Sequence, residues 1–322
     1  MRRREFLALT GGAAVTWPLA ARAQQTKVAR IGALYIGLAD AESFKKELRE
    51  GLRDLGYVEG QNIAFEFRSA EGQLDRLPGL AAELVRLKVD LIVALYVPCA
   101  LAAKDATRDI PIVIIAADPI ETGIVPSLAR PAGNITGVSL MSAASTAKNI
   151  ELFRDMLPLV QRIGILVNAA NPVYAKAMLD KVQLASGPTG IEIRPIVRVR
   201  GQDELENAFT TIMRDQAGAL VVQGDLAIKP VADMAVKYRV PAASTTRAFV
   251  EVGGLMSFGA DGPSAVRHGT KFVHRILQGR KPEDTPVEQP TKFELAVNLK
   301  TARAIGLKVP DTFLLRADAL LE

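Results

Sequence analysis

The sequence predicts an α/β protein with two Rossmann-like lobes, each a doubly wound parallel sheet, joined by a hinge in which the chain crosses several times. The first observation is that short apolar strands alternate with amphipathic helices along the chain. The second is that this alternation stops near residues 140–145 and then starts again. The third is that a helix at 264–277 and a strand at 292–299 follow the second block, so the chain must return to sheets that it has already formed.

The first strand is predicted at residues 28–35, where apolar side chains run almost without interruption up to the loop at Gly37. The helix after it begins at Asp40, whose carboxylate can cap the N-terminus, and ends at Gly56. Apolar side chains at helical spacing give this helix one buried face. The same patterns predict strands at 62–68, 91–96, 112–116 and 135–140 and helices at 77–85 and 146–157.

The second block repeats the pattern of the first. Strands are predicted at 162–167, 191–197, 219–223, 241–244 and 255–258, and helices at 174–184, 203–215 and 228–238. From these elements we predict that lobe 1 contains residues 24–140 and about 262–290. Lobe 2 is predicted to contain residues 141–261 and about 291–322. Because the chain passes between the lobes more than once, the connection is expected to act as a hinge.

The N-terminus has the layout of a secretory signal peptide. Three arginines at 2–4 form the charged start, an apolar run follows at 6–21, and Ala21-Arg22-Ala23 is a small-x-small cleavage site. The apolar run is shorter than the ~20 residues that span a bilayer. We therefore expect cleavage before Gln24. Export by the Sec or the Tat route stays open, because Arg3-Arg4-x-Phe6-Leu7 resembles part of a twin-arginine motif.

The composition of the exported chain argues against several classes of protein. Removal of residues 1–23 takes away four arginines and one glutamate, which leaves 36 basic and 34 acidic residues. With 5% aromatic residues, this nearly neutral chain is not expected to bind nucleic acid. No second apolar stretch is long enough for membrane insertion, and Cys99, the only cysteine, can form no intrachain disulfide. We expect a protein that is free in the periplasm.

Catalytic and cofactor motifs are not recognisable in the sequence. His268 and His274, the only histidines, are six residues apart on a predicted helix, which places them on different faces and argues against a shared metal site. Ser257 lacks the Gly-x-Ser-x-Gly spacing of a hydrolase nucleophile. The chain has no Walker lysine loop and no Gly-x-Gly-x-x-Gly after a strand. The sequence therefore predicts no cofactor, no metal and no enzymatic activity.

Carboxylates at predicted strand ends leave one enzymatic alternative open. Asp118, Asp225 and Asp261 each follow a predicted strand and could meet in a cleft for acid–base catalysis. Each could equally cap the helix or turn that follows it, and capping is favoured for Asp261, which precedes Gly262-Pro263. A periplasmic hydrolase or isomerase that uses Asp118 and Asp225 is therefore an alternative to a binding protein.

Polar and aromatic side chains follow predicted strands in both blocks. In open parallel sheets, ligands bind at the carboxyl ends of strands, against the N-termini of helices. The residues expected to contact a ligand are Tyr35, Tyr96, Asp118, Ser139, Ser142, Ser145, Thr146, Asn168, Asn171, Gly224, Asp225, Ser244, Thr245 and Phe258. Asp118 could bind an amine, and the segment from Ser142 to Thr146 could present hydroxyl and N–H groups to a carboxylate. An ordinary helix cap is an equal interpretation of each hydroxyl, and each tyrosine could simply be packed.

Seven segments carry a resemblance to a known family. They are LRDLGYVEGQN at 52–62, Asp118-Pro119, SLARP at 127–131, GNITGVS at 133–139, FVEVGGLMS at 249–257, QPTKFEL at 289–295 and NLKT at 298–301. Together they resemble the ABC-transporter substrate-binding family, which includes tryptophan- and tyrosine-binding proteins and has the type I periplasmic-binding-protein fold. The resemblance covers nearly the whole exported chain. It implies two lobes that close on a small ligand and deliver it to a membrane permease with a cytoplasmic ATPase.

The chain departs from this family at three places that bear on the ligand. Ser69 stands where relatives often carry tryptophan, Ser244-Thr245-Thr246 replaces an aromatic and acidic pair, and Gly224-Asp225-Leu226-Ala227 replaces an Asp-Pro-aromatic segment. The pocket of lobe 2 is therefore expected to be less aromatic than is usual in the family. An aromatic amino acid, a smaller amino acid or another organic acid fits this lining.

We accordingly expect the periplasmic solute-binding component of an ABC importer, which holds a small organic ligand, an amino acid or related carboxylate, between its lobes. A ligand that contacts both lobes favours the closed state by its differential affinity for that state. A protein that senses the ligand for a receptor or kinase shares this fold, so the residues do not separate it from a transporter component.

Overall fold

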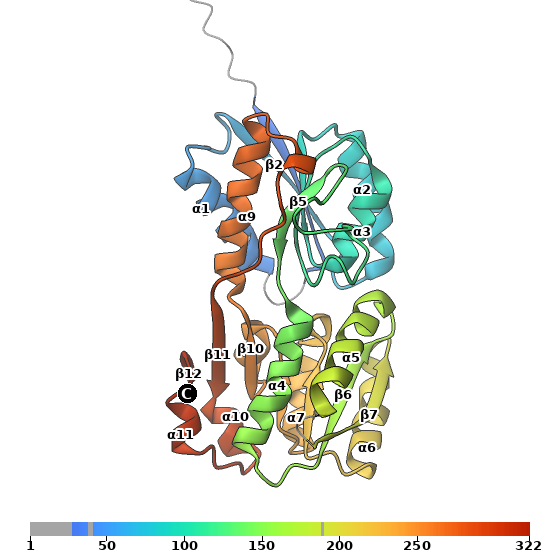
Figure 1. Ribbon diagram of the computed structural model, residues 1–322, viewed down its shortest axis with the longest axis vertical. Helices are drawn as coiled ribbons and strands as arrows, with labels where there is room; N and C mark the ends of the chain where they lie inside the picture. Colours follow the sequence, from blue (N-terminus) through green and yellow to red (C-terminus); the bar gives the residue numbers. More distant parts are fainter. Residues whose placement is uncertain (1–27, 38–40, 188–189) are drawn as a thin grey trace, which may run out of the picture.

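The computed structural model describes residues 28–37, 41–187 and 190–322. The predicted signal peptide (1–23) and the predicted helix cap Asp40 lie outside the described residues. Two lobes follow one another along the longest axis of the molecule, each with its own sheet (Figure 1). Helices cover both faces of both sheets, which confirms the predicted α/β class with two doubly wound lobes.

The sheet of lobe 1 has five parallel strands in the order β2-β1-β3-β4-β5. They are β1 (Ala29–Tyr35), β2 (Ile63–Ser69), β3 (Leu91–Leu95), β4 (Ile112–Ala116) and β5 (Ile135–Ser139). One face is covered by α1 (Ala41–Asp54) and α9 (Gly262–Leu277), and the other by α2 (Leu77–Arg86) and α3 (Val97–Ala106) (Figure 1). Every residue of β3 and β4 is buried between these layers, which explains why both strands are continuous apolar runs.

The sheet of lobe 2 has seven strands in the order β12-β11-β10-β9-β8-β6-β7. They are β6 (Arg162–Asn168), β7 (Glu192–Val199), β8 (Ala219–Val222), β9 (Ala242–Ser244), β10 (Met256–Ala260), β11 (Phe293–Asn298) and β12 (Ala319–Leu321). One face is covered by α6 (Leu205–Arg214), α7 (Lys229–Lys237) and α8 (Arg247–Glu251). The other face is covered by α4 (Ser142–Met156), α5 (Pro172–Ser186), α10 (Leu299–Ala304) and α11 (Asp311–Leu314).

Two strands of lobe 2, β11 and β12, run opposite to the other five, which the prediction of parallel sheets did not include. β11 pairs with β10 in the antiparallel sense, whereas the other neighbouring strands of this sheet are parallel. The chain reaches β11 directly from lobe 1, so it enters the sheet at the end where the parallel strands finish (Figure 1). It must then run in the opposite direction, and periodicity along the sequence contains no signal of this direction.

Two helices near the junction of the lobes differ from the predicted pattern. α4 begins at Ser142, four residues before the predicted start at 146, so the hydroxyl-rich segment that looked like a cap lies within the first turn. No helix was predicted at α3, where small apolar residues such as Ala100 and Ala103 give no distinct polar face, although Pro98 suits the start of a helix. Both helices begin next to strand ends of lobe 1, where the functional site lies.

Three crossings of the chain connect the lobes. The first leads from β5 into α4, the second from β10 into α9, and the third runs from α9 past β5 into β11 (Figure 1). In the third crossing, the Ser139 N–H donates to the Glu288 carbonyl at 2.9 Å, and the Glu288 N–H donates to the Gly137 carbonyl at 2.9 Å. Asp261 in the second crossing lies 3.3 Å from the Lys292 ammonium in the third. These contacts hold the three segments together as the predicted multi-crossing hinge.

Asp261 also accepts a hydrogen bond from the Ser264 N–H at 2.7 Å, which confirms the preferred interpretation of this residue as the cap of α9. Among the residues that the structure describes, no helix combines the length and the apolar character needed to cross a membrane.

Candidate ligand-binding cleft

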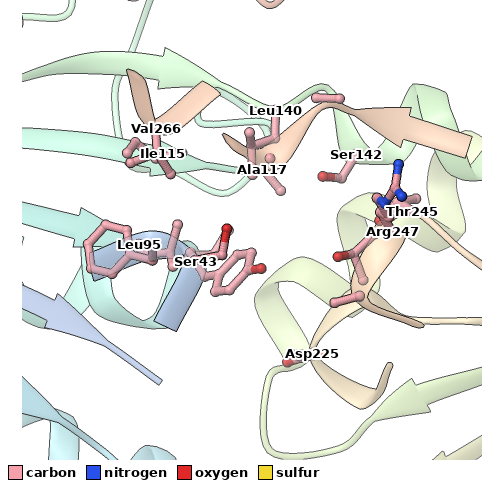
Figure 2. Close-up of a pocket in the computed structure, with 18 of the residues that line it drawn as sticks. Ser43, Leu95, Ile115, Ala117, Leu140, Ser142, Asp225, Thr245, Arg247 and Val266 are labelled. Carbon is pink, nitrogen blue, oxygen red and sulfur yellow. The ribbon is translucent and has the colours of Figure 1, made fainter. Parts of the chain in front are cut away.

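A cavity of about 170 Å³ lies between the two lobes, at the carboxyl ends of strands of both sheets. The lobe 1 wall is mostly apolar and includes Phe44, Leu95, Tyr96, Ile115, Leu140 and Val266. The lobe 2 wall is mostly polar and includes Ser142, Asn171, Asp225, Thr245, Thr246 and Arg247. Figure 2 shows Leu95, Ile115 and Val266 on one side of the cavity and Asp225, Thr245 and Arg247 on the other. A ligand in this space would contact an apolar surface of one lobe and polar groups of the other.

Five helices of ten or more residues begin at the cavity because the preceding strands end there, α1 and α9 among them. The other three are α3 after β3, α4 after β5 and α5 after β6. Their N-cap residues, Tyr96, Met141 and Asn171, make no side-chain hydrogen bond to the helix that they precede. The first N–H groups of a helix carry partial positive charge and attract anions. The cavity is therefore suited to a ligand that carries a carboxylate.

Asp118 follows β4 and lies at the junction of the two lobes. Only 8% of its surface is exposed, and its Oδ2 atom accepts a hydrogen bond of 2.8 Å from the Ala143 N–H in the first turn of α4. Burial is the main cause that raises the pKa of this carboxyl to about 6, and the hydrogen bond from Ala143 opposes it. Its neighbour Ala117 lines the cavity, so the carboxylate lies directly behind the lobe 1 wall.

Asp225 follows β8 and contributes its carboxylate to the lobe 2 wall. The side-chain amides of Asn168 and Asn171 donate to its Oδ2 atom, at 3.1 and 2.9 Å. Its Oδ1 atom is buried and has no hydrogen-bond partner in the described part of the chain. Burial raises the pKa of this carboxyl, and the two amides counteract the rise. The second oxygen is therefore an unsatisfied acceptor at the lobe 2 wall.

Tyr174, in the first turn of α5, lies within the electrostatic reach of both carboxylates. Burial raises the pKa of its hydroxyl, and the negative charges of Asp118 and Asp225 raise it further. The hydroxyls of Ser142 and Thr146 on α4 oppose this effect. Tyr174 and Asp225 both line the cavity, and Asp118 follows the wall residue Ala117 in the sequence.

The cationic side chain in the cavity wall is already neutralised by acidic partners. Arg247 donates from its Nε atom to Glu251 at 3.0 Å and from Nη1 to Glu294. Neither Asp118 nor Asp225 has a lysine, arginine or histidine nitrogen within 4.0 Å among the described residues. The cavity therefore has acidic groups in excess, a distribution that favours a ligand with a positive group.

One ion pair connects the lobes at the side of this site. The Lys181 ammonium on α5 lies 3.5 Å from the Glu121 carboxylate, which follows β4 in lobe 1. Both side chains are about 40% exposed, so water and salt screen their attraction. Exposed pairs of this kind contribute about 0.2–1 kcal/mol, which is too little to hold the lobes together without further contacts.

Several residues predicted from the sequence lie at the cavity. Those in its wall are Tyr96, Ser142, Asn171, Gly224, Asp225 and Thr245. Two others hold the wall from behind, because Asn168 donates to Asp225 and Asp118 accepts from Ala143. Thr146 donates to the Ser142 carbonyl at 2.9 Å and is buried beneath the first turn of α4.

Other predicted residues do not line the cavity, because their side chains are used within a lobe. The ring of Tyr35 packs 5.6 Å from Phe44, and the ring of Phe258 stacks on Phe293 at 5.9 Å. The Ser244 hydroxyl donates to the Val222 carbonyl at 2.9 Å. Ser139 and Ser145 are almost fully buried and are also absent from the wall.

The sequence analysis missed some residues of the wall, chiefly Ser43, Phe44, Tyr174, Arg247 and Glu251. Phe44 and Tyr174 lie within predicted helices, and their helical spacing does not mark them as residues of the wall. Their place in the chain could have identified them as wall residues, because each lies in or just after the first turn of a helix that follows a strand.

The two histidines have hydrogen-bond partners and the cysteine is buried, and none of the three lines the cavity. The His268 Nε2 atom lies 2.6 Å from Glu288, and the His274 Nδ1 atom lies 3.0 Å from the Tyr57 hydroxyl. Cys99 is buried in α3, and burial raises the pKa of its thiol. In the described ranges, no three His, Cys, Asp or Glu side chains are grouped so that they could hold a metal ion.

Comparisons with known proteins agree with this architecture. A tyrosine-binding protein of Clostridioides difficile (strain R20291) is 28% identical over 268 residues, which cover 82% of this chain and 76% of that protein. A conserved domain protein from Vibrio cholerae superposes with a TM-score of 0.85 at 25% identity, over 91% of this chain and 100% of the other. An ABC domain from Streptococcus pneumoniae in complex with L-Trp gives a TM-score of 0.84 at 26% identity, over 91% and 99% of the two chains.

The family model described as ABC transporter substrate binding protein matches residues 40–321. This match spans both lobes and all three crossings, together with the strand ends that surround the cavity. The chain therefore belongs to the ABC transporter substrate-binding protein family.

Proposed function

We propose that this protein is the periplasmic solute-binding component of an ABC importer, and that it captures an amino acid or a related carboxylate between its lobes. The observation that carries the proposal is the shared cavity, with an apolar wall from lobe 1 and a polar wall from lobe 2 that includes the Asp225 carboxylate, whose Oδ1 atom has no partner among the described residues. The relatives named for tyrosine and for bound L-Trp support an amino acid as ligand.

The ligand's ammonium group would bind at the acidic end of the cavity. The Oδ1 atom of Asp225 supplies a buried acceptor, and Asp118 adds negative charge at short range from lobe 1. The ligand's carboxylate would face the N-terminus of α3, whose N-cap side chain makes no hydrogen bond to the helix. Its side chain would pack on Leu95, Ile115 and Val266.

Closure of the lobes follows from this distribution of contacts. An open protein offers the ligand one wall at a time, so the ligand gains its full set of contacts only in the closed state. It therefore shifts the population toward closure by its differential affinity for that state. The Glu121–Lys181 pair adds a small increment, and the ligand supplies most of the difference.

The proposed partners are a membrane permease and its ATPase, and export across the inner membrane would use the predicted signal peptide. Membership of a substrate-binding family supports carriage without turnover. Asp225 would then act as a ligand acceptor, and Asp118 as a negative charge behind the wall, rather than as acid and base, and no cofactor is invoked.

Direct binding is the first test. Trp17, the only tryptophan, belongs to the predicted signal peptide, so residues 24–322 give no tryptophan background and bound L-Trp can be followed by its own fluorescence. We expect saturable binding of L-Trp, L-Tyr or a smaller amino acid, and a smaller radius of gyration in solution scattering when the ligand is present. Chemical conversion of the ligand would support the enzymatic alternative. Failure of a panel of amino acids and organic acids to bind would refute the proposal.

The pH dependence of affinity is a second test. The unliganded Asp118 carboxyl, with a pKa of about 6, is mostly protonated below that pH, whereas an ammonium ligand favours its ionised form. Binding must then release a proton at low pH, so affinity is expected to fall as the pH decreases through 6. The loss should approach about tenfold between pH 7 and pH 5.

Isothermal titration with an amino acid across this range measures the effect. Asp118→Asn should bind more weakly at pH 7 and lose most of the pH dependence, because the amide does not titrate. Equal slopes in Asp118→Asn and the unchanged protein would show that Asp118 does not contact the ligand's charge.

A further inference from the structure

Tyr96 has a backbone conformation that belongs almost entirely to glycine. Its φ is 74° and its ψ is 162°, a region in which a side chain clashes with the neighbouring peptide groups. The residue connects the end of β3 to the start of α3. Its N–H donates to the Ile115 carbonyl at 2.8 Å, and its carbonyl accepts from the Ala100 N–H at 3.0 Å. Strand pairing on one side and the helix on the other therefore hold this strained backbone in place.

Three of the other residues with positive φ are explained by helix termination. Lys88, Gln216 and Arg239, with φ of 52°, 54° and 54°, come just after α2, α6 and α7, where a left-handed residue commonly ends a helix. Tyr96 lies instead at a strand end on the cavity, where glycine would fit without strain. A bulky residue at such a position points to a function for its ring.

The ring of Tyr96 belongs to the lobe 1 wall. It packs against both apolar clusters of lobe 1 and is only partly buried, so it is not a side chain that the core needs in order to be filled. The cavity of about 170 Å³ is smaller than the ~300–1,000 Å³ of sites that hold drug-sized ligands. A ring in this wall takes up space that a larger ligand would use.

We propose that Tyr96 determines the upper size limit of the ligand, and this inference rests on the proposed function. The strained backbone directs the ring toward the space between the lobes, and the ring restricts the apolar subsite beside Leu95 and Ile115. Removing the ring should both relax the backbone and admit larger ligand side chains.

The test uses residues 24–322 with Tyr96→Gly, Tyr96→Ala and Tyr96→Phe. L-alanine, L-leucine, L-phenylalanine and L-tryptophan serve as probes of increasing size in calorimetric titrations. Tyr96→Gly is expected to shift the ratio of affinities toward the larger probes by about tenfold or more, because one methylene in an apolar pocket already changes selectivity about tenfold. Tyr96→Phe should keep the size preference of the unchanged protein.

Thermal unfolding tests the strain independently of any ligand. Glycine accepts this conformation, so Tyr96→Gly should melt about 2 °C or more above Tyr96→Ala. Gln216→Gly and Gln216→Ala form the matched control pair, because they alter an ordinary left-handed position away from the cavity and should leave ligand preference unchanged.

The outcomes separate this inference from the proposed function. If the unchanged protein binds amino acids and folded Tyr96→Gly has the same size preference, the assignment of Tyr96 is wrong while the proposed function stands. If the folded, unchanged protein binds none of the four probes, an amino acid ligand and the size limit are both refuted.

Discussion

Asp225→Ala is expected to weaken amino acid binding by about 10- to 150-fold, the effect of losing a hydrogen bond to a charged group worth about 1.5–3 kcal/mol. The Oδ1 atom of Asp225 is the buried acceptor in the lobe 2 wall that has no partner among the described residues. Its loss also removes the acceptor that holds the amides of Asn168 and Asn171. Calorimetric titration at pH 7.5, above the pKa of Asp118, measures the change without interference from that group.

Two further variants serve as controls for the Asp225→Ala result. Asp225→Asn keeps the shape of the side chain but removes its charge, so its affinity should fall between those of the unchanged protein and the alanine variant. Asp233→Asn alters an exposed carboxylate on α7, paired with Lys229, and should leave affinity unchanged. Undiminished binding by folded Asp225→Ala would exclude this carboxylate from the ligand site.

Gly259→Ala is expected to lower the free energy of unfolding by about 2–4 kcal/mol. A Cβ atom at this position in β10 would lie 1.9 Å from the Thr245 carbonyl oxygen. Because the atom that it meets is backbone, no side-chain rotation removes the clash, and β10 must separate from the segment after β9. That segment includes Thr245 and Thr246 of the cavity wall, so ligand affinity should fall as well.

Denaturant unfolding measures this effect, with Gly79→Ala as the control. Gly79 lies in α2, and a Cβ atom there would meet nothing within 4 Å. Alanine should therefore stabilise the helix by about 0.5–1 kcal/mol. An unchanged midpoint for Gly259→Ala would mean that the two segments separate at no cost, which is incompatible with the packing described above.

The strands of lobe 1 are the part of the fold that the sequence predicted best. β3 and β4 lie between helices on both faces, so burial imposes an apolar residue at every position, and the limits of the run are the limits of the strand. The helix α3 was not predicted, and burial is again the reason. Its small apolar residues produce no amphipathic period, although the helix forms and covers the sheet.

The candidate site was predictable in kind but not in detail. Residues after strand ends were expected to converge, and Tyr96, Asn171 and Asp225 do lie in one wall. Whether a given carboxylate oxygen is free depends on neighbours distant in sequence, as the amides of Asn168 and Asn171 on Asp225 illustrate. The contacts of all these residues with a ligand, and the exact limits of the two lobes, stay predictions.

The sequence by itself determined the class of fold, the two blocks, the repeated crossings and the resemblance to a family, because local periodicity and short motifs encode these features. Only the tertiary structure decided the direction of β11 and β12, the hydrogen bonds of Asn168 and Asn171 to Asp225, and the glycine-like backbone of Tyr96. These features depend on which chain segments meet at the cleft. Contacts between distant segments depend on how whole lobes pack. The pattern of residues within a single segment therefore does not predict them.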